Sequence, residues 1–176
     1  MPIEQGPHAS LRNTTLSELL DLQTKSFIYG DYWDIKREFF PSMQQLGSGV
    51  ITTTEDVDCV EFDWGKIHFL SEPAVTNANR FSFGIVELSP GQGHARHNHP
   101  GSEEIIYIVS GEGEQMVDDK PPVKVGPGAS IYVPADVYHS TVNTGTETMK
   151  LIVVYSPAGP ERLLREIPGA KVIPAG

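Results

Sequence analysis

The chain's 176 residues suffice for one domain with a sizeable core, and 39% hydrophobic and 20% charged residues are ordinary for a globular protein. A net charge of −10 with only 13 Lys and Arg argues against nucleic acid or membrane as partner, since both require clustered basic side chains. The single cysteine, Cys59, cannot form an internal disulfide. No signal-peptide pattern and no apolar run near ~20 residues is evident, so we expect a soluble cytoplasmic protein.

The first element that the sequence predicts is a helix over residues 14–27, TTLSELLDLQTKSF. Thr15 or Ser17 can cap its first turn, and its leucines recur at helical spacing. The following residues, 28–49, are rich in Tyr, Trp and Phe, which indicates a segment that packs onto another surface.

From residue 57 onward the sequence is typical of short β-strands joined by Gly- and Pro-containing turns. The predicted strands cover residues 57–64, 66–70, 80–88, 103–111, 129–134, 138–145 and 148–156, and residues 114–128 predict a hairpin followed by a turn. Short strands at roughly ten-residue spacing indicate a β-barrel or sandwich.

Three regions follow from this pattern. We expect residues 1–56 to form an N-terminal helix and arm that packs on the barrel or on a partner, and residues 57–157 to form the barrel. We expect residues 158–176 to form a C-terminal arm, with a short helix or turn near 161–166.

The stretch HARHNHPGSEE holds three histidines within six residues, followed by two glutamates. His97 and His99 stand two apart, so on a strand both side chains would project from one face and could chelate a metal. A carboxylate from a neighbouring strand would add a third ligand, and strand alternation alone does not decide between Glu103 and Glu104. His139 is the remaining strand histidine near a Gly/Pro turn and is a candidate for the fourth.

Two segments resemble the paired motifs of the cupin superfamily. Residues 91–111, GQGHARHNHPGSEEIIYIVSG, are similar to G-(x)5-H-x-H-(x)3,4-E-(x)6-G, and residues 128–143, GASIYVPADVYHSTVN, to G-(x)5-P-x-G-(x)2-H-(x)3-N. One position departs from the pattern: Asp136 replaces a glycine, and Asp tolerates unusual turn conformations reasonably well. The resemblance covers roughly residues 80–156 and implies an all-β fold, a single jelly-roll β-barrel, to which we add the N-terminal helix and extended terminal arms.

The resemblance also implies that one divalent transition metal is bound by His97, His99, Glu104 and His139, with the motif spacing favouring Glu104 over Glu103. Imidazole and carboxylate ligands suit Mn, Fe, Ni, Co or Zn, and the sequence does not choose among them. An octahedral metal held by four side chains would keep two positions for water, substrate or dioxygen.

The function we predict is a metal-dependent enzyme acting on a small polar or anionic metabolite in the barrel pocket. The reaction would be that of an isomerase, lyase, decarboxylase or Fe(II) dioxygenase. The alternative is a sugar- or small-acid-binding cupin without turnover. The resemblance to small cupins implies a homodimer. Because an open barrel leaves strand edges that need covering, we expect part of residues 28–70 to lie at the dimer interface.

Six further side chains have predicted environments. His94 is expected to be a solvated turn histidine, and Arg96 is expected to point away from the barrel. Tyr107 is expected to pack in the core, and Tyr132, Tyr138 and Tyr155 are expected to lie in the core or at its rim.

Overall fold

The structure is a computed structural model, and it describes residues 43–176. The predicted helix over 14–27 lies outside the described residues. Ser42–Gly176 is one compact unit. Within the described residues, neither helix is long and apolar enough to cross a bilayer.

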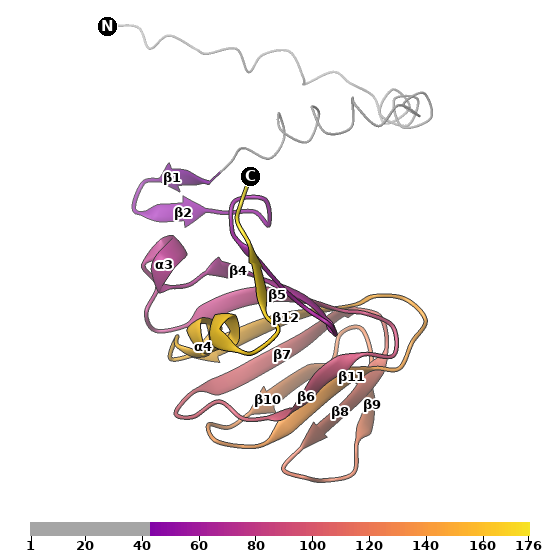
Figure 1. Cartoon of the computed structure of the whole chain (residues 1–176). Coiled ribbons are helices and arrows are strands. Elements are labelled where there is room, and N and C mark those ends of the chain that lie inside the picture. The colour runs from indigo at the N-terminus through magenta and orange to yellow at the C-terminus, as the bar shows by residue number, and fades with distance from the viewer. Residues whose placement is uncertain (1–42) are drawn as a thin grey trace, which may run out of the picture. The chain divides into compact units, whose positions relative to one another are not determined.

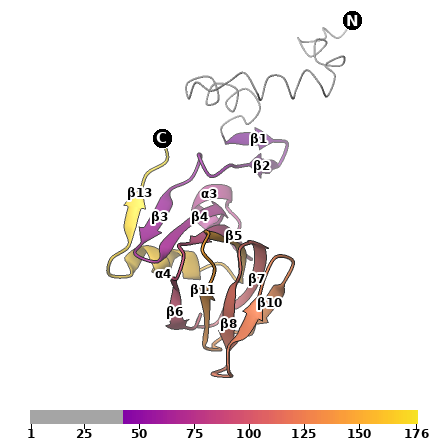
Figure 2. The ribbon, with the colours of Figure 1, turned by 90° about the vertical axis from the view of Figure 1, so that its right-hand side faces the viewer.

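Two antiparallel sheets form the two layers of this unit, with the larger sheet lying over the smaller one (Figure 1). The larger sheet contains, in spatial order, β10 (Ser130–Val133), β7 (Glu103–Ser110), β12 (Met149–Ser156), β5 (Ser82–Leu88), β4 (Gly65–Ser71), β3 (Cys59–Phe62) and β13 (Lys171–Ile173). The smaller sheet contains β6 (Gly93–His97), β11 (His139–Asn143), β8 (Gly113–Val117) and β9 (Val123–Val125), of which β6, β11 and β8 lie side by side in Figure 2. This arrangement confirms the predicted all-β jelly-roll.

Three short elements complete the described chain. A separate hairpin pairs β1 (Gln44–Leu46) with β2 (Gly49–Ile51), and the two helices are α3 (Pro73–Thr76) and α4 (Pro160–Glu166). The helix α4 agrees with the short helix or turn predicted near 161–166. The hairpin and α3 were not predicted, because three- and four-residue elements are too short to show a periodic pattern.

The core fills the space between the sheets through strict alternation along the strands. In β12, Met149, Leu151, Val153 and Tyr155 point inward and are each at most 3% exposed. Alternating inward residues of β5 and β7 meet them, as expected for strands with one buried face. The charged exception among the inward positions of β7 is Glu104, which is 3% exposed.

Alternation along β7 also corrects one prediction. Tyr107 is 41% exposed, so its assignment to the core is wrong. Because Glu104 turns inward, residues 103, 105 and 107 turn outward, and this places Ile105 and Val109 on the same exposed face as Tyr107. Apolar character alone could not reveal this orientation.

Two turn positions of the motifs have the backbone conformations that their sequence suggests. Gly111 has φ +83°, and a Cβ there would lie 2.7 Å from the Cα of Met149, so only glycine fits. Asp136, in place of the usual glycine, has φ +67° and its carboxylate accepts a 3.1 Å hydrogen bond from the Gly101 N–H. The expected tolerance of aspartate at this turn is therefore confirmed.

Asn143 joins three backbone segments at the end of β11. It is 0% exposed, its amide donates to the carbonyls of Leu88 (3.0 Å) and Glu147 (2.8 Å), and its Oδ1 accepts from Gly145 (2.9 Å). We expect Asn143→Ala to lower the free energy of unfolding by about 2–4 kcal/mol, because buried carbonyls lose their donors. Urea denaturation measures this, with the exposed Asn79→Ala as control; equal stability of the two variants would contradict it.

Candidate metal centre

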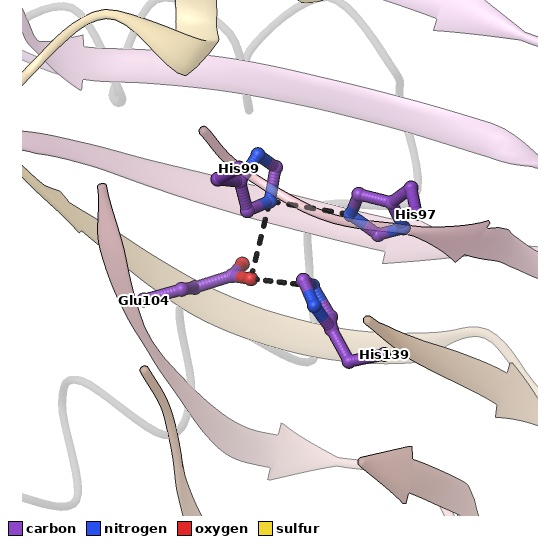
Figure 3. Close-up of side chains that lie close together, drawn as sticks. All are labelled: His97, His99, Glu104 and His139. Carbon is purple, nitrogen blue, oxygen red and sulfur yellow. Dashed lines mark hydrogen bonds and ion pairs between the residues drawn. The ribbon is translucent and has the colours of Figure 1, made fainter. Parts of the chain in front are cut away.

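The four side chains predicted as ligands come from both sheets and from the loop after β6, and they point toward one another (Figure 3). His97 is the last residue of β6 and His139 is the first of β11, and the two are directly paired across these strands. Glu104 projects from β7 in the facing sheet. His99 follows the end of β6, so the expectation that both histidines share one strand is wrong.

The potential ligand atoms of His97, His99, Glu104 and His139 all lie within 4.8 Å of one another. The Nε2 atoms of His97 and His99 are 3.2 Å apart. A Glu104 carboxylate oxygen lies 2.8 Å from Nε2 of His139 and 3.3 Å from that of His99. Such a cluster is able to hold a metal ion.

The loop after β6 is held so that His99 reaches this centre. Its backbone carbonyl accepts hydrogen bonds from the amides of Ser102 (3.2 Å) and Asp136 (3.3 Å). The His99 ring is 7% exposed and lies 4.6 Å, between centroids, from the ring of Tyr155. Tyr155 is 2% exposed, which confirms its place in the core, whereas Tyr132 (56%) and Tyr138 (42%) are exposed.

Two imidazoles are oriented by backbone carbonyls on their far side. Nδ1 of His97 donates to the Ala95 carbonyl (2.7 Å), and Nδ1 of His139 to that of Val137 (3.1 Å). In the neutral rings the proton is therefore on Nδ1, and the Nε2 lone pair faces the centre. A lone pair directed at a buried carboxylate is repulsive unless a cation lies between them. Nε2 of His139 and the adjacent Glu104 oxygen indeed have no conventional hydrogen-bond partner.

The charge states suit a metal ion. Burial would raise the pKa of Glu104, but the close contacts with the imidazoles of His139 and His99 outweigh it and lower the value to about 2. Burial, followed by the proximity of His94, lowers the pKa of His97 to about 3. Burial would also lower the pKa of His139, but the interaction with Glu104 raises it, so in the metal-free protein a proton can occupy this contact. The centre therefore offers a carboxylate and imidazoles, the ligand type of divalent transition metals.

The competing carboxylate takes no part in the centre. Glu103 points to the outer face of β7, where it accepts a 2.9 Å hydrogen bond from the Tyr132 hydroxyl. The structure thus resolves the choice that alternation left open and brings Glu104 into the cluster.

The environment predicted for His94 is wrong. Its ring lies between those of Trp64 (5.0 Å between centroids) and His97 (3.8 Å), and burial lowers its pKa to about 4. The pairing of β6 with β11 shifts register between His97 and His94, and this irregularity sets both rings on the same side of the strand. Sequence spacing gave no signal of it. Arg96 is exposed as predicted and pairs with Asp119.

Two cavities adjoin the cluster. The inner one, about 30 Å³, lies between the sheets among Ile106, Leu151 and Val153, with Glu104 and His139 on its wall. The outer one, about 350 Å³, lies between the loop 98–102 and the C-terminal segment 157–167, with His97 and His99 among its lining. The outer cavity thus has room for an organic molecule beside the cluster, whereas the inner one has not.

Comparison with known proteins identifies the relatives of this chain. The family model described as Cupin domain matches residues 84–155. The chain is 33% identical to Protein SchB of Streptomyces halstedii over 97 residues, which are 54% of this chain and 69% of that protein. It is 33% identical to the Oxalate-binding protein of Thermotoga maritima over 87 residues, 49% of this chain and 70% of that protein.

Solved structures share the fold. The oxalate decarboxylase of Lactobacillus farciminis, solved as a formate complex, superposes with a TM-score of 0.57 at 26% identity, covering 62% of this chain and 33% of that chain. This chain therefore corresponds to about a third of that enzyme.

The pKa values of the buried histidines predict an acid-sensitive metal-free protein. In the unfolded chain, His94 and His97 take up protons as the pH falls below 6.5. In the folded chain, His94 takes up a proton only near pH 4 and His97 only near pH 3. Stability is therefore lost across this window. The pKa of His139 is raised, so its contribution to folding stability is constant below pH 6.5. The pKa of Glu104 is lowered, so its contribution to folding stability begins to be lost only near pH 4.5.

We expect the free energy of unfolding of the metal-free protein to fall by roughly 2–4 kcal/mol between pH 7 and pH 5. Urea denaturation in the presence of a chelator measures the change. His94→Phe should flatten the dependence, because one of the two proton-binding sites is removed. A stability that is constant over this range in the original protein would contradict the assignment.

Proposed function

The chain belongs to the cupin superfamily, and from this premise we propose that it is a metal-dependent enzyme acting on a small polar or anionic molecule. His97, His99, Glu104 and His139 would hold one divalent ion, which could be Mn, Fe, Ni, Co or Zn. The observation that carries the proposal is the buried carboxylate of Glu104 beside Nε2 of His139, without a conventional hydrogen bond.

A divalent ion at this position supplies a Lewis acid for a substrate oxygen, or a site for dioxygen. The protein contributes the geometry: the carbonyls of Ala95 and Val137 fix the rings of His97 and His139, so that Nε2 of each faces the ion. The apolar side chains around the inner cavity keep bulk water away from the side of Glu104. The reaction would be an isomerisation, lyase reaction, decarboxylation or Fe(II)-dependent dioxygenation.

A second candidate function is binding of a small acid or sugar without turnover. It is favoured by the 33% identity to a relative named Oxalate-binding protein. The decarboxylase structure, at 26% identity, favours the enzyme instead. Both candidates use the same metal centre, so turnover alone separates them.

Removing two ligands tests the metal centre. We expect about one divalent ion per chain in the original protein and close to none after His97→Ala with His139→Ala, because only His99 and Glu104 would remain. Elemental analysis of protein purified without added metal measures the content. His68→Ala, in β4 and outside the cluster, is the matched control and should keep its ion. Full occupancy in the double variant would show that the ligand assignment is wrong.

Turnover is measured on samples loaded with one metal at a time and supplied with small carboxylic acids and sugars. Product formed by at least one metal-loaded sample, and by neither the metal-free protein nor the double variant, supports the enzyme. Tight binding with no product from any metal would favour the binding protein.

We also propose that the protein is a cytoplasmic homodimer. Support comes from an apolar face on the outer side of the larger sheet, where Ile105, Tyr107, Val109 and Tyr132 are each 41–56% exposed. The division of the chain into three regions, with boundaries after residues 56 and 157, stays a prediction. The placement of part of residues 28–70 at the dimer interface also stays a prediction.

A dimer has twice the mass of one 19.3 kDa chain. We expect size-exclusion chromatography with light scattering to give this doubled mass. Ile105→Lys with Tyr107→Lys should shift the protein toward the monomer, because it charges the apolar face. A monomeric mass for the original protein would exclude the dimer.

A further inference from the structure

We propose that the outer cavity binds an organic acid with an apolar body of several carbons, and that the helix α4 (Pro160–Glu166) determines this preference. The inference rests on the proposed metal centre, because His97 and His99 line the same cavity. It adds the class of substrate that the centre would receive.

The lining of the outer cavity is mostly apolar. Its apolar walls come from the loop after β6 and from the C-terminal segment: Pro100, Pro157, Pro160, Leu163, Leu164 and Ile167. Two of these apolar side chains are exposed to solvent: Leu163 is 50% and Ile167 is 42% exposed. An apolar ligand body would cover them and remove this surface from water, which favours binding.

The wall formed by α4 is anchored at its beginning by a buried carboxylate. Glu161 is 3% exposed and accepts hydrogen bonds from the Ser82 hydroxyl (2.9 Å) and from the Gly159 amide (2.8 Å). Leu164, on the same helix, is 4% exposed and belongs to the hydrophobic core. These contacts hold α4 against β5 and the interior of the sandwich.

A second buried carboxylate anchors the end of α4. The Arg165 guanidinium pairs with both carboxylate oxygens of Glu72, which is 3% exposed, and lies 5.6 Å from the ring centroid of Phe69. Two-point pairing of this kind fixes orientation as well as position. Because both ends of α4 are held, the outer cavity is formed before any ligand arrives, and its shape can select among ligands.

The charges at this cavity favour an anion. Three neutral imidazoles and one carboxylate around a divalent ion would have a net charge of +1. Arg162 is the only charged side chain among the described residues of the lining other than histidine, and it forms no ion pair with another residue of 43–176. These positive groups lie in a chain of net charge −10, so the attraction for an anion is local to the cavity.

The volume of the outer cavity sets the size of the apolar part of the ligand. Its volume of about 350 Å³ equals roughly a dozen water molecules at ~30 Å³ each, more than a two-carbon acid can fill. The inner cavity, at about 30 Å³, holds about one water and cannot take an organic chain. The apolar body must therefore lie along α4.

A series of straight-chain carboxylates tests the inference. We expect the affinity of the Co(II)-loaded protein for acetate, butyrate, hexanoate and octanoate to rise about two- to fourfold per added methylene until the cavity is full. Calorimetric titration gives the affinities, and the visible spectrum of Co(II) reports ligands that reach the metal. Metal content is measured on the same samples.

Two variants separate the apolar and the charged contributions. Leu163→Ser should reduce the ratio of the affinities for octanoate and butyrate at least threefold. Val172 is similarly exposed but lies on β13, so Val172→Ser should leave this ratio unchanged. Arg162→Gln should weaken all carboxylates about tenfold and leave the alcohols of equal length unaffected, and Lys124→Gln on β9 is its control.

The outcomes distinguish this inference from the proposed function. Full metal content with an affinity that does not change with chain length overturns the inference and leaves the metal centre intact. An original protein that binds none of the ions Mn, Fe, Ni, Co and Zn overturns the proposed function, and the inference with it. A chain-length effect that survives Leu163→Ser unchanged shows that α4 is not the determinant.

Discussion

The described structure depends on one buried carboxylate that needs a cation. Glu104 occupies an inward position of β7 that would otherwise complete a row of isoleucines, and burying a charge there is costly unless it is compensated. Its carboxylate contacts the imidazoles of His139 and His99, and the Nδ1 proton of His139 points away from it toward the Val137 carbonyl. A proton shared with His139 can compensate the charge in part, and a divalent ion would compensate it fully.

Because this carboxylate comes from one sheet and the histidines from the other side of the sandwich, the centre and the fold are coupled. His97 and His139 face each other across β6 and β11, and Glu104 pairs with Tyr155 and Val133 in the larger sheet. An ion held by both groups would join the two layers at a point where apolar packing is interrupted. Binding energy would therefore also be folding energy.

In the proposed function, the metal centre and the selection of ligands would involve different parts of the chain. The barrel positions the cluster, whereas the cavity beside it is closed by α4, which Glu161 ties to β5 and the pairing of Arg165 with Glu72 ties to the segment before α3. A change in α4 could therefore alter what the cavity accepts without changing the cluster, because the fold alone does not determine the reaction.

Much of the fold and the core of the site could be predicted because they depend on the spacing of residues that lie close together in the sequence. Alternating apolar residues and turn glycines indicated the strands, and the resemblance to the two cupin motifs, with their fixed spacing of His97, His99 and Glu104 and of Pro134 and His139, implied the cluster. These patterns depend on neighbours in the chain, which a sequence displays directly.

Other features depended on how distant strands pair, and only the tertiary structure decided them. The register irregularity between β6 and β11 turned His94 onto the side of His97, and the inward orientation of β7 separated Glu104 from Glu103 and exposed Tyr107. The C-terminal arm became strand β13 by pairing with β3. Each outcome is set by contacts between residues far apart in the chain, which no local pattern encodes.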